Sequence, residues 1–437
     1  MKVYFLTLGC RVNRYETDAM RRLFLDKGFE VTEAASEADC CVVNTCSVTG
    51  EADRKSHQML RKMARLNPDA VVVATGCSAE LADGVLDCDL IVGNREKNTI
   101  ADRVLEYMKQ QGKHEHTASH IRPEVTKKDE YHDFGSVLSP EGTRAFIKIE
   151  DGCNNFCTYC AIPYARGRVA SRSFESCVEE AKFLAEAGYK EITVSGIHLC
   201  SYGKDRGEDI MSLLKLLQAI DSVPGVERLG LGSLEPMSMT EEFIDGLAGL
   251  KHLCPHFHLS LQSGSDTVLK RMNRRYDTAE YAKRVELLRS RFPDMSLTTD
   301  IITGFPGETE EEFEETCLFA QKMKFAKIHV FPYSEREGTA AAAMPQMDMS
   351  MRKARAAELI KISDELSSEF AAGMTGRTAE VLVETAADGI PEGYTANYVR
   401  TKITSGAGIS DIRSGDIVRG VISGRDGAFC LMDLRIK

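Results

Sequence analysis

Cys153, Cys157 and Cys160 stand within one short run of the chain, Gly152-Cys-Asn-Asn-Phe-Cys-Thr-Tyr-Cys160. Thiolates at this spacing can hold three irons of a four-iron cubane cluster, and no fourth cysteine stands nearby to bind the last iron. One iron would therefore stay open to another ligand. A structural zinc site is the alternative, but such sites close with four ligands, commonly as paired Cys-x2-Cys units, and no matching pair follows here.

Residues 1–108 alternate short apolar runs with helical patterns, which predicts a doubly wound α/β domain. The first strand is expected over residues 2–8 and the first helix over residues 13–27. Asn13, followed three residues later by Glu16, predicts that this helix begins with an N-cap and a capping box.

Three further cysteines follow strands of this predicted domain, at the point where each strand ends. Cys10, Cys46 and Cys77 each come directly after such an apolar run. The carboxyl ends of parallel strands meet at one edge of a sheet, where open α/β sheets build their sites. These thiols could hold a second cluster, or they could be core residues, as we expect of Cys40 and Cys41 within a strand.

The composition limits the class of protein. A chain of 437 residues is long enough for about two to four domains. Its 14 cysteines do not indicate a secreted disulfide framework, because Met1 opens directly into a strand-like run and no signal peptide is expected. No stretch approaches the roughly 18 apolar residues of a membrane span, so we expect a soluble, cytoplasmic protein without a membrane partner. A net charge of −11 argues against generic nucleic-acid or DNA binding, although a nucleic acid could still dock locally.

Residues 109–140 are polar and have no clear periodicity. A histidine-rich metal tract is one interpretation of this segment, but the irregular spacing favours a solvated linker. The histidines concerned are His114, His116, His120 and His132.

Residues 141–370 repeat a pattern of strand, loop and helix, which predicts a partial or complete β/α barrel with six parallel strands. Functional residues of such a barrel should follow the strands, at the carboxyl-end face. Glycines there let a ligand approach the backbone, and polar side chains can hold hydroxyl or amino groups. The candidate cofactor-binding residues on these loops are Ser195, Gly196, Ser233, Glu235, Gln262 and Gly304.

Two arginines close behind the cysteine run are candidate substrate residues. Arg166 and Arg168 would border the mouth of the barrel, where a guanidinium can bind a phosphate or a carboxylate in bidentate fashion. A solvated charged surface is the alternative.

Residues 373–437 form short β-rich runs separated by Gly, Asp and Ser turns, which predicts a small antiparallel β-barrel of the oligonucleotide-binding kind. Tyr398 and Arg400 mix an aromatic ring with a cation, as a nucleic-acid surface does. We therefore include both among the candidate substrate residues.

The six cysteines in two sets, together with the order of the predicted domains, resemble the radical S-adenosylmethionine (SAM) methylthiotransferase family over essentially the full length. Tyr159, just before the last cysteine of its run, fits the radical SAM signature. Gly393-Tyr-Thr-Ala-Asn-Tyr398 is similar to part of a TRAM domain, the small C-terminal barrel of that family. The run Thr7-Leu-Gly-Cys-Arg-Val-Asn-Arg-Tyr-Glu-Thr17 is similar to the MtaB branch of the family, from which Arg11 and Arg14 depart.

This resemblance implies an activity, its cofactors and its partners. Enzymes of that branch add a methylthio group to carbon 2 of N6-threonylcarbamoyladenosine at position 37 of tRNA, beside the anticodon. Each set of cysteines would hold a [4Fe-4S] cluster, the barrel set to cleave SAM and the N-terminal set to supply the methylthio group, with two SAM molecules used per turnover. Tyr159 and the loop residues named above would bind SAM. The implied partners are the tRNA anticodon stem-loop and an electron donor of the flavodoxin or ferredoxin class.

Three other functions fit parts of the pattern. A methylthiotransferase for N6-isopentenyladenosine in tRNA, or for an aspartate of a ribosomal protein, would carry the same two sets of cysteines. A non-catalytic iron–sulfur sensor that binds RNA would need the clusters, but it would not need ligand-binding loops after five successive barrel strands.

Overall fold

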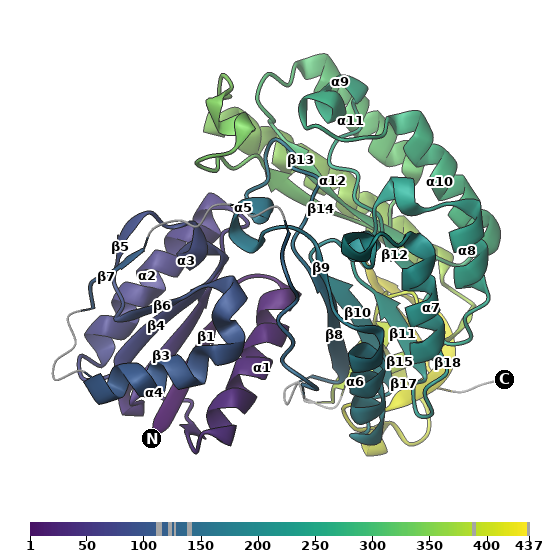
Figure 1. Ribbon diagram of the computed structural model, residues 1–437. Helices are drawn as coiled ribbons and strands as arrows, with labels where there is room; N and C mark the ends of the chain where they lie inside the picture. The colour runs from purple at the N-terminus through teal and green to yellow at the C-terminus, as the bar shows by residue number, and fades with distance from the viewer. Residues whose placement is uncertain (111–115, 121–124, 126–127, 138–141, 387–389, 435–437) are drawn as a thin grey trace.

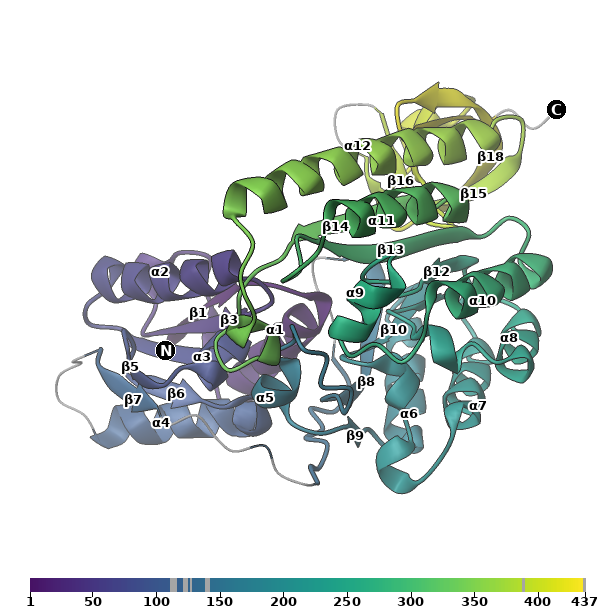
Figure 2. The same cartoon turned by 90° about the horizontal axis from the view of Figure 1, so that it is seen from above.

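The computed structural model of the protein describes residues 1–110, 116–120, 125, 128–137, 142–386 and 390–434. An N-terminal α/β unit lies beside a larger unit of strands and helices (Figure 1). In Figure 2, the long helix α12 (Met349–Gly373) runs over the larger unit towards the C-terminal strands. The predicted α/β class is confirmed. None of the helices in the described part of the chain combines the length and apolar character that a membrane crossing needs.

The N-terminal unit contains a parallel sheet with the strand order β2-β1-β3-β4-β6. Every residue of β3 and β4 is buried, as is usual for central strands covered by helices on both faces. Helices α1 and α4 pack on one face, and α2 packs on the other. The elements are β1 (Lys2–Thr7), α1 (Arg11–Asp26), β2 (Glu30–Val31), β3 (Cys40–Thr45), α2 (Gly50–Leu66), β4 (Val71–Gly76), α3 (Cys77–Leu81), β5 (Gly84–Leu86), β6 (Leu90–Val92) and α4 (Ile100–Gln110).

The polarity of residues 109–140 indicates a solvated linker, but the described residues of this segment make specific contacts. Strand β7 (Ala118–His120) pairs antiparallel with β5, and His116 contacts Asp89 rather than another histidine. Farther along, the Tyr131 hydroxyl donates to the Lys148 carbonyl at 2.9 Å. His114 lies outside the described residues. Polarity alone did not reveal these contacts, because their partners are distant in the sequence.

The larger unit is a partial barrel of six parallel strands in the order β8, β10, β11, β12, β13, β14. A parallel bridge between Leu234 and Leu259 joins its two halves. Strands β8 and β14 stand at the ends of this order and do not pair with each other in the described structure. The strands are β8 (Arg144–Asp151), β10 (Glu191–Gly196), β11 (Arg228–Leu231), β12 (His256–His258), β13 (Ser296–Thr303) and β14 (Lys327–Pro332), with the short β9 (Ala170–Ser171) antiparallel to β8.

Helices cover the outside of this partial barrel, and their apolar faces form the largest hydrophobic core of the protein with the strands. Thr309 and Asp277 begin two of these helices with capping boxes. These helices are α6 (Phe174–Glu186), α7 (Ile210–Asp221), α8 (Glu241–Ala248), α9 (Asp266–Arg271), α10 (Thr278–Arg291) and α11 (Glu310–Met323). The short α5 (Ile162–Arg166) lies against the N-terminal unit instead.

The C-terminal strands form a closed barrel in the order β15-β16-β17-β19-β18. We predicted an antiparallel barrel, but β17 and β19 are parallel. A closed barrel with an odd number of strands cannot alternate direction throughout, so at least one pair must be parallel. The strands are β15 (Thr378–Thr385), β16 (Glu392–Thr395), β17 (Arg400–Ser405), β18 (Ile417–Asp426) and β19 (Phe429–Asp433).

Candidate active site

Cys10, Cys46 and Cys77 lie at the carboxyl ends of β1, β3 and β4, which are neighbours in the sheet. Gly9 has φ +97°, and a Cβ at this position would lie 2.5 Å from the Sγ of Cys46. Only glycine allows the Cys10 loop to come so close. Burial, together with the nearby thiols of Cys77 and Cys10, raises the pKa of Cys46 to about 11. The three thiols therefore converge at one edge of the sheet.

The second set of cysteines lies on the loop after β8. Burial, together with the nearby thiol of Cys157, raises the pKa values of Cys153 and Cys160 to about 12. The Nη1 of Arg274 donates to the Sγ of Cys157 at 3.3 Å. These three thiols are thus close neighbours with a cation against one of them.

Both sets have the donors that a sulfur-ligated cluster needs. All six cysteines are free. In each set one sulfur accepts from a backbone N–H at 3.5 Å, Cys46 from Val48 and Cys153 from Asn155. Such N–H···S contacts stabilise cluster thiolates, and thiols that burial keeps protonated give up their protons when a metal takes the place of the proton. The two sets therefore fit two iron–sulfur clusters, each with three protein ligands.

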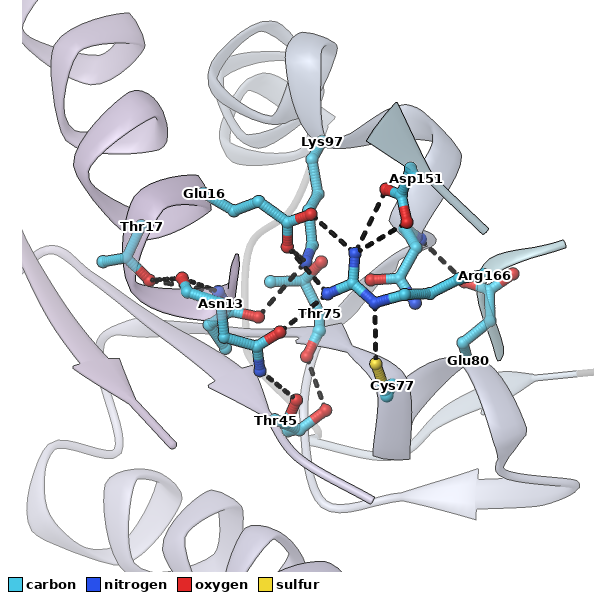
Figure 3. Close-up of polar contacts among 12 residues, drawn as sticks. Asn13, Glu16, Thr17, Thr45, Thr75, Cys77, Glu80, Lys97, Asp151 and Arg166 are labelled. Atoms are coloured by element: carbon cyan, nitrogen blue, oxygen red, sulfur yellow. Dashed lines mark hydrogen bonds and ion pairs between the residues drawn. The ribbon is translucent and has the colours of Figure 1, made fainter. Parts of the chain in front are cut away.

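Arg166 connects the two sets from α5, the helix that follows the barrel cysteines (Figure 3). Its Nε donates to the Sγ of Cys77 at 3.2 Å, and its Nη1 donates to Glu16 at 2.7 Å. The side chain of Arg166 has no exposed surface. Its guanidinium also donates hydrogen bonds to the side chains of Asn13 and Asp151.

Glu16 is the central anion of this contact between the two units. Lys148 of β8 donates to it at 2.7 Å, and Lys97 of the N-terminal unit is also paired with it. Burial opposes the charge of Glu16, but Arg166 and these lysines hold its pKa well below the usual range. The site is therefore supported by a buried, charge-compensated network.

Two sequence predictions change at this network. The predicted capping box of Asn13 and Glu16 is wrong, because α1 begins at Arg11 with Cys10 as its N-cap, and neither side chain caps it. Asn13 instead donates to the carbonyl oxygens of Leu8 and Thr45, both at 2.9 Å. Arg166 is not at an open mouth of the barrel but inside the contact between the units. The local pattern could not show this, because every partner of Arg166 named above is distant in sequence.

A cavity of about 220 Å³ lies between the two sets of cysteines. One wall contains Cys160 and the other contains Ser47, directly after Cys46. The thiol of Cys77 also contributes to raising the pKa of Cys160, which shows that the two sets are close together. The cavity is lined by Ser47, Val48, Thr49, Tyr159, Cys160, Ala161, Ile162, Gln262, Asp300, Ile302, Phe331, Pro332, Tyr333, Ser334 and Arg336.

Of the predicted cofactor residues, Tyr159 and Gln262 line this cavity. Glu235 is tied to the barrel cysteines through Arg274, whose Nη2 donates to its two carboxylate oxygens at 2.9 and 2.8 Å. His198 lies 3.4 Å from the same carboxylate. Sequence reasoning missed Arg274, because it lies beyond the loops that directly follow the strands.

The other predicted cofactor residues have different surroundings. A Cβ at Gly196 would lie 2.2 Å from the carboxylate of Glu150, so Ser195 and Gly196 lie beside the end of β8. Ser233 is exposed. At Gly304, φ is +68° and a Cβ would lie 2.6 Å from the Cγ of Arg352, so this glycine allows α12 to pack closely.

Tyr398 and Arg400 lie far from the cysteines. The Tyr398 hydroxyl is bonded to Glu191, the first residue of β10, and its ring stacks on His256 with centroids 4.6 Å apart. This is the amino-end face of the partial barrel, about 25 Å from the cysteine loop along the eight-residue strand β8. Arg400 is exposed and pairs with Glu392 at 2.9 Å. The Tyr398 ring therefore joins two units instead of forming an open surface.

Arg168, the remaining predicted substrate residue, is half-buried. Its guanidinium lies 4.4 Å from the centroid of the Phe156 ring, inside the loop of barrel cysteines. It therefore packs on the cysteine loop.

Comparison with protein-family models agrees with the two cysteine-bearing units. The model described as the radical SAM superfamily matches residues 147–320, and that of the uncharacterized protein family UPF0004 matches residues 2–89. Among solved structures, the radical S-adenosylmethionine methyltransferase TsrM from Kitasatospora setae has a similar fold, with a TM-score of 0.58 at 16% identity over 78% of this chain and 77% of that one.

Curated relatives extend the similarity to nearly the whole chain. The threonylcarbamoyladenosine tRNA methylthiotransferase MtaB of Bacillus subtilis (strain 168) is 40% identical over 91% of this chain and 89% of its own. The protein of the same name from Aquifex aeolicus (strain VF5) is 38% identical over 88% and 93%. The tRNA-2-methylthio-N(6)-dimethylallyladenosine synthase of Syntrophus aciditrophicus (strain SB) is 35% identical over 96% and 91%. The chain belongs to the radical SAM methylthiotransferase family.

Proposed function

We propose that this protein adds a methylthio group to carbon 2 of N6-threonylcarbamoyladenosine at position 37 of tRNA. The observation that carries the proposal is the cavity between the two sets of cysteines, in a chain that is 40% identical to an MtaB enzyme over 91% of its length. When bound, a cluster held by the barrel set would supply the radical chemistry of SAM, and a cluster held by the N-terminal set would supply the methylthio group.

The protein's own residues hold and orient these groups. Cys153, Cys157 and Cys160 would ligate one cluster, and Cys10, Cys46 and Cys77 the other. Arg274 bridges Cys157 and Glu235, so it fixes the ligand-binding carboxylate relative to the cysteine loop. Gln262 and Tyr159 then offer a polar group and a ring to SAM on the cavity side.

A base in the cavity would lie between the radical source and the sulfur source. Phe331 lines the cavity with 37% of its surface exposed, so its ring is available for stacking. The base must be unpaired to enter, and an anticodon loop presents such a base. Hydrogen removal and sulfur addition could then take place from opposite sides of one adenine without movement of the tRNA.

Helix α2 offers a docking surface for the tRNA backbone. It begins at the wall of the cavity, and five exposed cations follow along it. Because the whole chain carries a net charge of −11, this local basic surface is the feature that favours phosphate binding. The cations are Arg54, Lys55, Arg61, Lys62 and Arg65.

The reaction also needs a one-electron donor, for which we propose a protein of the flavodoxin or ferredoxin class. With tRNA as the substrate, the cytoplasm is the expected place of action.

The proposal is tested under anaerobic conditions by reconstituting the clusters and adding SAM, reductant and tRNA that carries both hypermodified adenosines. The tRNA is digested and its nucleosides are identified by mass spectrometry. We expect methylthio on threonylcarbamoyladenosine. Methylthio on the isopentenyl base alone would assign the enzyme to the rival substrate, and SAM cleavage without thiolation of either base would overturn the tRNA substrate.

Variants separate the roles of the two sets. Cys153→Ala should abolish SAM cleavage, whereas Cys77→Ala should spare cleavage and abolish thiolation. Cys317→Ala, at a buried cysteine of α11 outside both sets, is the matched control and should retain both activities. Thiolation by the Cys77 variant would contradict the assigned roles.

A further inference from the structure

Arg336 is the one cation among the described residues that line the cavity. It follows β14, at the carboxyl end of the last barrel strand, and only 9% of the residue is exposed. Its buried Nε has no hydrogen-bond partner in the described structure. The guanidinium therefore has unused bonding capacity on the side where a substrate base would enter.

The acidic groups near Arg336 leave this capacity open. Its ion-pair partner is Asp53 of α2, but the Nη2–Oδ1 distance of 3.6 Å is longer than a hydrogen bond. The neighbouring Glu335 and Glu337 are exposed. Asp300, the acidic residue of the cavity wall, lies 3.4 Å from the Nε2 of His258.

The start of α2 builds the other side of this corner. The backbone N–H of Gly50 donates to the Oγ of Ser334 at 2.8 Å, and a Cβ at Gly50 would lie 3.8 Å from the Nη1 of Arg336. Helix α2 is 17 residues long, and the positive end of its dipole faces this corner. Both the arginine and the helix therefore favour a negatively charged ligand group.

We propose that Arg336 is the binding subsite for the free carboxylate of the threonyl group on the substrate base. This inference rests on the proposed function and names the side chain that selects the substrate. A planar guanidinium can bind a carboxylate through two parallel hydrogen bonds. An apolar isopentenyl group, or an unmodified adenine, offers no carboxylate to the guanidinium and would leave its buried Nε without a hydrogen bond, so the same residue disfavours the neighbouring class of substrate.

The test uses the complete, reconstituted enzyme and two anticodon stem-loops. One carries N6-threonylcarbamoyladenosine, and the other carries the same base with its carboxylate replaced by a neutral carboxamide. We expect the wild-type enzyme to prefer the carboxylate substrate by about 30-fold or more in kcat/KM, the factor for loss of one partner of a buried charge pair. Arg336→Gln should lose this preference, because kcat/KM should fall for the carboxylate substrate and not for the carboxamide.

Two further variants distinguish substrate binding from a structural role. Asp53→Asn removes the ion pair between α2 and Arg336 but leaves the cation, so it should keep the preference. If Arg336→Gln does not fold, Arg336→Lys keeps the charge without the planar fork and should show a reduced preference.

An unchanged preference in Arg336→Gln, or in Arg336→Lys where that variant replaces it, would overturn the inference. Loss of the preference in Asp53→Asn would overturn it as well, since it would assign the effect to the contact between the units. If the wild-type enzyme thiolates neither stem-loop, the proposed function itself fails.

Discussion

The Nε of Arg166 lies 3.2 Å from the Sγ of Cys77, although the two residues come from different units of the fold. Arg166 follows the barrel cysteines in α5, and Cys77 begins α3 of the N-terminal unit. Figure 3 shows that the same guanidinium also reaches Glu16 and Asp151. One side chain thus fixes the position of a proposed cluster ligand relative to the loop that carries the other set of cysteines.

Arg166→Lys should lower methylthio transfer by about 10- to 100-fold, the usual effect of removing a group that supports a metal ligand. The lysine keeps a charge near Glu16, but it cannot reach Glu16 and Cys77 together. Transfer is measured by mass spectrometry and SAM cleavage separately, and cleavage should fall much less. Arg168→Lys is the control, because Arg168 packs on Phe156. Equal losses in both variants would show that Arg166 has no special relation to Cys77.

Gly9→Ala should prevent assembly of the N-terminal set. The new Cβ would lie 2.5 Å from the Sγ of Cys46, and φ at this position is +97°. We expect the iron content to fall towards that of one cluster. Thiolation should be lost, whereas SAM cleavage should continue. Gly28→Ala has the same backbone strain, with φ +82°, but nothing lies within 4 Å of its Cβ. An iron content equal to that of this control would contradict the prediction.

His256 should make the protein less stable as the solution becomes acidic. Burial lowers the pKa of His256 to about 3, whereas an unfolded chain has a value of about 6.5. Between these values only the unfolded chain binds the proton. Stability is therefore lost as the pH falls below about 6.5, by about 1.4 kcal/mol per pH unit.

Thermal melting at pH 7.5 and pH 5.5 measures this effect. The wild-type melting temperature should fall more between the two values than that of His256→Gln. His57→Gln, in helix α2, should behave like the wild type. An equal fall of the melting temperature in His256→Gln and in the wild type would show that another group controls the acid sensitivity.

Lys62→Glu combined with Arg65→Glu should weaken tRNA binding and make it less dependent on salt. Both cations are exposed on α2, and each phosphate contact adds about 0.7 to 0.9 to the slope of log affinity against log salt concentration. Binding is measured over a series of salt concentrations. Lys182→Glu combined with Lys215→Glu changes the charge equally on α6 and α7, where both residues are exposed, and should affect binding less. Equal effects of the two double variants would indicate only general charge repulsion.

The fold class could be predicted because its signals are local. Apolar runs such as Val71–Gly76 identify buried strands, and the chain order of strands and helices then identifies the α/β class. The same order placed Cys10, Cys46 and Cys77 directly after strands, and the structure brings them together because β1, β3 and β4 are neighbours in one parallel sheet. Spacing along the chain was sufficient for the barrel cysteines, since all three share one loop.

The sequence by itself determined which residues end each strand, and therefore which thiols can meet at a sheet edge. Only the tertiary structure decided what faces them. Asn13 and Glu16 have the spacing of a capping box, yet packing of the two units buries both against Arg166. Arg336 has no local signal, since its place beside α2 depends on how the N-terminal unit meets β14. Helix and strand patterns record interactions between near neighbours, whereas charge pairing across an interface depends on residues that are far apart in sequence.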